Sequence, residues 1–78
     1  MIEEAKQMRV RINLDTMSDV QKFVEIVSRV DAPVILKDSA GHCVSGSSLL
    51  GALYTMEWSE VYCECEKDIT YGIFHWIV

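Results

Sequence analysis

The stretch "SGSSLLGALYTM", Ser45 to Met56, places three serines directly before an apolar, helix-forming run. A serine just before a helix accepts a hydrogen bond from a free amide of the first turn, which contributes about 1 kcal/mol of stability. The stretch therefore predicts a capped helix after the serines. A serine hydroxyl is also an acceptor for phosphate, so the same residues suggest a phosphorylation site at a helix start.

The segment before these serines predicts a strand followed by a helix. Apolar and polar residues alternate over residues 7–14, which is the period of a half-buried strand. Ser18 follows as a helix cap, with Gln21 three residues later as in a capping box. From there apolar residues keep helical spacing and form one stripe that faces a core. This stripe consists of Val20, Phe23, Val24, Val27 and Val30.

A hairpin connects this helix to the serine stretch. Pro33 ends the helix, because proline disfavours helical geometry in the residue before it. Residues 33–38 are typical of a strand, and Gly41 suits the positive φ of a turn that leads to a short strand at residues 42–44. The two strands are therefore expected to pair in an antiparallel sheet.

Beyond the serine stretch, residues 60–67 predict a fourth strand, in which Val61, Cys63 and Cys65 alternate with polar residues. The last residues, 68–78, fit a short helix or a further strand. The element order is therefore strand, helix, strand, strand, helix, strand, short helix. This order predicts an α+β fold, an open-faced two-layer sandwich whose helices cover one face of a mostly antiparallel sheet.

Composition bounds both the fold and the class of function. A chain of 78 residues with 50% apolar content fits one domain that spans residues 1–78. The net charge is −5 and the seven basic residues form no cluster, which argues against a nucleic-acid partner. No segment has the pattern of a signal peptide or a membrane span, so we expect a cytoplasmic protein without membrane contact.

Cys43, Cys63 and Cys65 are an odd number of thiols without C-x-x-C spacing, which favours buried free thiols in a reducing compartment. A zinc site that combines these thiols with His42 or His75 lacks the standard ligand spacing. We therefore expect neither a metal nor a cofactor.

The run Ser48-Leu49-Leu50-Gly51-Ala52-Leu53, together with the element order, resembles the HPr family, the histidine-containing phosphocarrier of the bacterial sugar phosphotransferase system. The run is similar to the second helix of that family. The resemblance implies an HPr-like sandwich in which a regulatory serine kinase phosphorylates Ser48. The docking surface for phosphotransferase proteins would then consist of Leu49, Leu50 and Leu53. From the residues alone, the serine remains a helix cap and the leucines remain core residues.

The phosphorylation motif of the family is missing. HPr proteins carry the pattern Gly, apolar, His, any, Arg, Pro after the first strand, where the histidine takes phosphate from enzyme I. The corresponding connection here, "LDTMSDV" at residues 14–20, holds no histidine, arginine or proline. Asp15 and Asp19 would repel an incoming phosphoryl group, so we expect no histidine phosphotransfer at this place. His42 and His75 are interpreted as structural or exposed residues.

The C-terminal segment also departs from the family, whose last helix is considerably longer and covers much of the sheet. The tail "DITYGIFHWIV", residues 68–78, therefore predicts an uncovered apolar surface. Its aromatic residues either anchor a homodimer or another protein partner, or they fill the space that the missing helical turns leave. These residues are Tyr71, Phe74 and Trp76.

The sequence thus predicts a non-catalytic, HPr-like binding or regulatory module, in which phosphorylation of Ser48 gates the docking of a protein partner. Two alternatives remain. One is a divergent phosphocarrier that uses another acceptor residue, and the other is a small structural or oligomerising protein. We expect no enzymatic activity from the chain itself.

Overall fold

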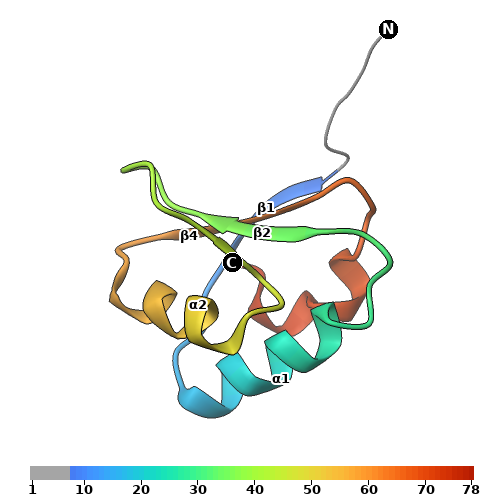
Figure 1. The fold of residues 1–78 in the computed structure, drawn as a ribbon, viewed down its shortest axis with the longest axis horizontal. Coiled ribbons are helices and arrows are strands. Elements are labelled where there is room, and N and C mark those ends of the chain that lie inside the picture. The colour runs from blue at the N-terminus through green and yellow to red at the C-terminus, as the bar shows by residue number, and fades with distance from the viewer. Residues whose placement is uncertain (1–7) are drawn as a thin grey trace, which may run out of the picture.

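Four strands and two helices form two layers in the computed structural model, which describes residues 8–78 (Figure 1). The strands are β1 (Met8–Ile12), β2 (Val34–Lys37), β3 (Cys43–Ser45) and β4 (Val61–Cys65), in the sheet order β1-β4-β2-β3. All neighbouring strands are antiparallel. The helices α1 (Met17–Val27) and α2 (Leu49–Tyr54) lie on one face of the sheet (Figure 1). The predicted α+β fold, an open antiparallel sheet with both helices on one face, is confirmed.

The strand β4 lies between β1 and β2 although it is the last strand in the sequence. Met8 and Ile12 of β1 pair with Cys65 and Val61 of β4, and all four side chains are buried. Cys63 between them is also buried, so the alternation predicted for this strand is confirmed. The apolar rows of the two strands together form the middle of the core.

The helix α1 begins earlier than the sequence predicted. Thr16 is its N-cap, because the Oγ1 atom accepts a hydrogen bond from the Asp19 amide at 3.0 Å. Ser18 lies inside the helix, so the predicted cap was wrong; both residue types suit an N-cap, and local pattern does not choose between them. Val30 lies beyond the end of the helix. The residues that face the core as predicted are Val20, Phe23 and Val27.

A tight turn joins β2 to β3. Gly41 has a φ of 102°, the left-handed conformation that favours glycine, as predicted. The Oδ1 atom of Asp38 accepts hydrogen bonds from the amides of Ala40 at 3.0 Å and His42 at 2.8 Å. These bonds fold the turn around the aspartate side chain.

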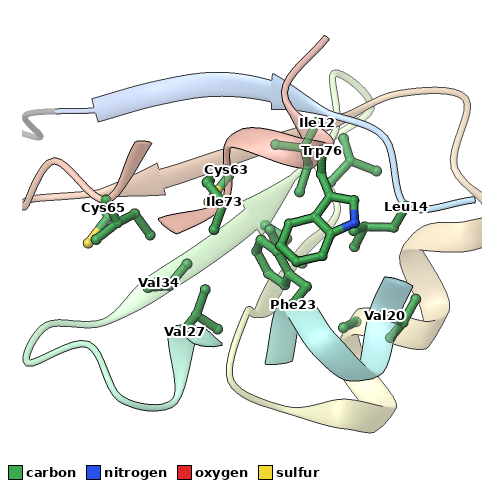
Figure 2. Close-up of a cluster of buried hydrophobic side chains, with 14 of the residues drawn as sticks. Ile12, Leu14, Val20, Phe23, Val27, Val34, Cys63, Cys65, Ile73 and Trp76 are labelled. Atoms are coloured by element: carbon green, nitrogen blue, oxygen red, sulfur yellow. The ribbon is translucent and has the colours of Figure 1, made fainter. Parts of the chain in front are cut away.

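The tail after β4 forms two short 3-10 turns, Thr70–Gly72 and Phe74–Trp76, instead of an α-helix or a full strand. The turns direct Ile73 and Trp76 into the core, where both side chains lie among residues of the sheet and of α1 (Figure 2). The tail therefore completes the core that the two helices leave open.

Trp76 links the tail to the first elements of the described chain. Its ring meets Phe23 of α1 edge to face, with the ring centroids 5.7 Å apart and an interplanar angle of 77° (Figure 2). Its indole N–H donates a hydrogen bond to the carboxylate of Asp19 in the first turn of α1. Ile77 then forms an isolated bridge with Ile12 of β1. The tail thus holds both α1 and β1.

Burial separates the three free cysteines into two kinds. Cys63 and Cys65 are buried, as expected, whereas Cys43 is exposed and the expectation was wrong for it. The reason is the register of the hairpin: Cys43 pairs with Lys37 on the face of the sheet that carries no helix. Desolvation, together with the nearby Cys65 and Glu64, raises the pKa of the Cys63 thiol to about 12.

Candidate functional site

Ser48 caps α2, as its place in the sequence predicted. The residue has extended backbone angles, and its Oγ atom accepts a hydrogen bond from the Gly51 amide at 3.1 Å. Ser45 and Ser47 do not share this role: their Oγ atoms lie 3.0 Å apart and bond to each other. Ser48 is an exposed residue, and its phosphorylation stays a prediction.

The small residues of the motif allow α2 to approach the sheet closely. A Cβ atom on Gly51 would lie 3.2 Å from the Cβ atom of Val44 in β3. Ala52, the next residue, is completely buried. Close packing on this side turns the larger residues of the helix toward solvent.

Apolar side chains are exposed along residues 49–56. Eight large apolar side chains are exposed in the part of the chain that the structure describes, and four of them belong to this stretch. Leu50 is 67% exposed, and Tyr54, one helical turn later, is 59% exposed. Neighbouring apolar side chains in water are typical of an interaction surface. We call this group the α2 surface, which consists of Leu49, Leu50, Tyr54 and Met56.

The structure separates the three leucines that the sequence proposed as contacts. Leu49 and Leu50 are exposed, whereas Leu53 is half-buried and packs against the core. The prediction that Leu53 is an exposed contact was therefore wrong. Leu53 stands directly after the buried Ala52, on the flank of α2 that turns toward the core. Spacing alone could not show this, because it does not say where a six-residue helix meets the sheet.

A shallow cleft of about 400 Å³ separates the α2 surface from α1. Leu49 lines one side of it, and Lys22, Val24 and Glu25 of α1 lie on the other side. The exposed leucines therefore continue into a groove whose rim carries both charges. A partner helix or loop could cover both parts of this surface.

The residues in the connection between β1 and α1 take part in contacts that hold the fold together. The hydrogen bond from the indole of Trp76, together with bonds from Thr16, holds the pKa of the Asp19 carboxyl below its ordinary value. Leu14 is buried and Asp15 is exposed at the mouth of a neighbouring cleft. The two aspartates that we expected to repel phosphate thus lie near the start of α1. The carboxylate of one of them, Asp19, already interacts with Trp76 and Thr16.

His42 belongs to a cluster that the sequence did not indicate. Its Nδ1 atom lies 2.7 Å from the Oδ2 atom of Asp38, and its ring stacks on Trp58 with the centroids 5.6 Å apart. Burial alone would raise the pKa of Asp38, but the hydrogen bonds and charge of His42 hold it below its ordinary value. His75 is exposed in the tail, as expected. In the sequence, the four-residue spacing between Asp38 and His42 could have indicated the contact between them. The contact of His42 with Trp58 could not be found in this way, because the two residues are far apart along the chain.

The aromatic residues of the tail divide between the two interpretations. Trp76 is 8% exposed and belongs to the core, so the prediction that it anchors a partner was wrong. It fills the space beside Phe23, as the second interpretation held. Tyr71 and Phe74 are 87% and 70% exposed and stay predicted contacts of a homodimer or partner.

No family matches. Comparisons of the chain with protein-family models, with curated proteins and with solved structures all found no match. The function therefore has to be inferred from the surface of the molecule itself.

Within residues 8–78, no three His, Cys, Asp or Glu side chains lie where they could share a metal ion. None of the helices in the same range is both long and apolar enough to cross a membrane.

Proposed function

We propose that the chain is an HPr-like, non-catalytic binding module, related to the phosphoenolpyruvate-dependent sugar phosphotransferase system, that docks a protein partner on the α2 surface. The observation that carries this proposal is the exposure of Leu49 and Leu50 directly after the capping Ser48. A pair of leucines in a short amphipathic helix is usually core. Here the core is filled by other residues, so these two are available to a partner.

Phosphorylation of Ser48 would gate this docking. Phosphate brings a charge of about −1.5 to −2 and would stand one and two residues from the exposed leucines. The free amides of the first turn of α2 favour such a charge, so the fold would tolerate it. A partner that buries the leucines would instead have to desolvate the phosphate, which weakens docking.

The residues in the connection between β1 and α1 fit a module that does not carry phosphate there. A phosphoryl group placed there would meet Asp15 and Asp19, and no histidine stands in this segment. Asp19 is moreover engaged with the indole of Trp76. These groups support a module that binds without carrying phosphate at this position.

The proposal is tested with purified enzyme I and HPr kinase. The chain is incubated with phosphoenolpyruvate and enzyme I, and separately with ATP and the kinase, and intact mass is measured. We expect one acid-stable phosphate in the kinase reaction, absent in Ser48→Ala. Binding to both proteins is then measured by biolayer interferometry with Leu50→Glu, and with Val78→Glu as the matched exposed control. Loss of binding in the first variant alone supports docking on α2; no phosphate and no binding would contradict the proposal.

A second candidate is a phosphocarrier that uses His42. The Nδ1 atom faces Asp38, so the Nε2 atom of this 63% exposed side chain would be the nucleophile. This candidate predicts an acid-labile phosphate in the enzyme I reaction that disappears in His42→Gln. A labile phosphate that persists in that variant would exclude His42.

A further inference from the structure

The face of the sheet opposite the helices concentrates positive charge. Within the paired strands its charged side chains are three cations and one carboxylate, a net charge of +2, whereas the whole chain carries −5. In Figure 1 no helix covers this face. The cations are Arg9, Arg11 and Lys37, and the carboxylate is Glu64.

The carboxylate of this face is mostly buried, whereas the two cations that pair with it are partly exposed. The Glu64 side chain is 12% exposed; its Oε2 atom lies 3.0 Å from Arg9 Nε and its Oε1 atom lies 3.2 Å from Lys37 Nζ. The side chains of Arg9 and Lys37 are 50% and 44% exposed. Both cations have further N–H donors besides those that face Glu64, because a guanidinium has five and an ammonium three.

Tyr62 lies between two cations in one row across the sheet. It pairs with Arg11 of β1 on one side and with Lys37 of β2 on the other. Arg11 is exposed and forms no ion pair with any residue in the range 8–78. Neighbouring strands are about 4.8 Å apart, so the two cations flank the ring at a distance that their long side chains can span.

We propose that this open face of the sheet binds an acidic segment of a protein partner, with its carboxylates on Arg11, Lys37 and the free donors of Arg9. Arginine binds carboxylates through paired N–H donors, and such bonds are roughly twice as strong as neutral ones. The face lies on the layer opposite the α2 surface, so it stands independently of the function proposed above.

The positive charge of the open face and the contacts of the Tyr62 ring favour an acidic protein segment over other partners. A second copy related by two-fold symmetry would bring the same cationic face against itself, which is repulsive. A single nucleic-acid strand would stack bases on the aromatic ring, but the Arg9 guanidinium carbon already lies 4.3 Å from the Tyr62 ring centroid. The charge of −5 also repels a polyphosphate chain more than a short carboxylate segment.

Fluorescence anisotropy tests the proposal on the full chain. The probe is a labelled peptide of alternating glutamate and threonine, and the control peptide replaces glutamate by glutamine. Arg11→Glu and Lys37→Glu change the open face, whereas Lys22→Glu in α1 and Arg29→Glu just after the end of α1 make the same charge changes elsewhere on the molecule. Circular dichroism confirms that each variant is folded.

We expect saturable binding of the glutamate peptide that weakens roughly tenfold or more in Arg11→Glu and Lys37→Glu and stays within about twofold in Lys22→Glu and Arg29→Glu. Arg11→Lys should keep most of the affinity. Equal weakening in both sets would mean diffuse attraction and overturn the proposal. Absence of binding, or tighter binding of a labelled thymidine oligonucleotide than of the peptide, would overturn it as well.

Discussion

Trp76 is a side chain that joins distant parts of the chain. It packs against Phe23, bonds to Asp19 and closes the core from the tail. Trp76→Ala should therefore lower the free energy of unfolding by about 3–5 kcal/mol, as removal of a buried large side chain does. Urea denaturation measures this change. Phe74→Ala, two residues away but 70% exposed, is the control and should change it by less than about 0.5 kcal/mol.

Asp19 makes the free energy of unfolding depend on pH in the acid range. Its pKa in the folded chain lies below the ordinary value of 3.8, so the carboxylate stabilises the fold above that value. The contribution is lost as the pH falls through the folded pKa. Asp19→Asn should flatten the decline of the unfolding free energy on the acid side, measured by urea midpoints at a series of pH values.

Trp76→Phe provides the matched variant for this titration, because it removes the indole N–H and keeps an aromatic ring. It should flatten the acid-side decline in the same direction as Asp19→Asn. If Asp19→Asn declines as steeply as the parent chain, the bond to the indole is not the source of the acid sensitivity.

The thiols should differ in reactivity by burial. Cys43 is exposed, whereas Cys63 is buried and its pKa is raised to about 12. Only a thiolate reacts readily, so the native chain should react with Ellman's reagent at Cys43 alone. In urea all three thiols should react. Rapid reaction of two or more thiols in the native chain would show that the cysteine row of β4 opens to solvent.

At the scale of elements, α2 depends on its cap. Ser48→Ala removes the acceptor for the Gly51 amide and should lower the free energy of unfolding by about 1 kcal/mol. Ser48→Asp should restore most of this loss, because a carboxylate also caps. Thermal denaturation compares these variants with Ser47→Ala, whose hydroxyl bonds to the hydroxyl of Ser45. An equal loss in Ser47→Ala would mean that the serines cap jointly.

The strands could be predicted from the sequence because alternation is a local property. Met8, Ile12 and the cysteine row of β4 are buried as their spacing required. The start of α1 was not predictable to the residue, since Thr16 and Ser18 are both good caps. The tail has too few residues to separate a 3-10 turn from an α-helix, so only its buried positions could be inferred.

The candidate site was predictable only in part. Ser48 follows from capping chemistry, whereas the exposure of Leu50 and the burial of Leu53 depend on how α2 meets β3 through Gly51. The stack of His42 on Trp58 joins residues from different connections, which no local pattern reveals. Long-range packing therefore decided what local spacing could not.

At the scale of the whole molecule, the two layers present different surfaces. The helical layer shows apolar side chains on α2, and the open face of the sheet shows cations on an otherwise acidic chain. Two partners could therefore be held at once without competing for the same residues. The variants Lys22→Glu and Arg29→Glu serve as controls because Lys22 lies in α1 and Arg29 directly follows it, outside the strands of the sheet.

The order of strands in the sheet has a consequence for biosynthesis. Because the strand that pairs with β1 among residues 8–78 is β4, β1 has no partner strand until residues 61–65 have been translated. A nascent chain that stops earlier can form α1 and the β2–β3 hairpin but leaves Met8 and Ile12 without their cover. Such an intermediate exposes an unpaired apolar strand, so ribosome-bound truncations ending before β4 should recruit chaperones that release the chain once β4 and Trp76 have emerged.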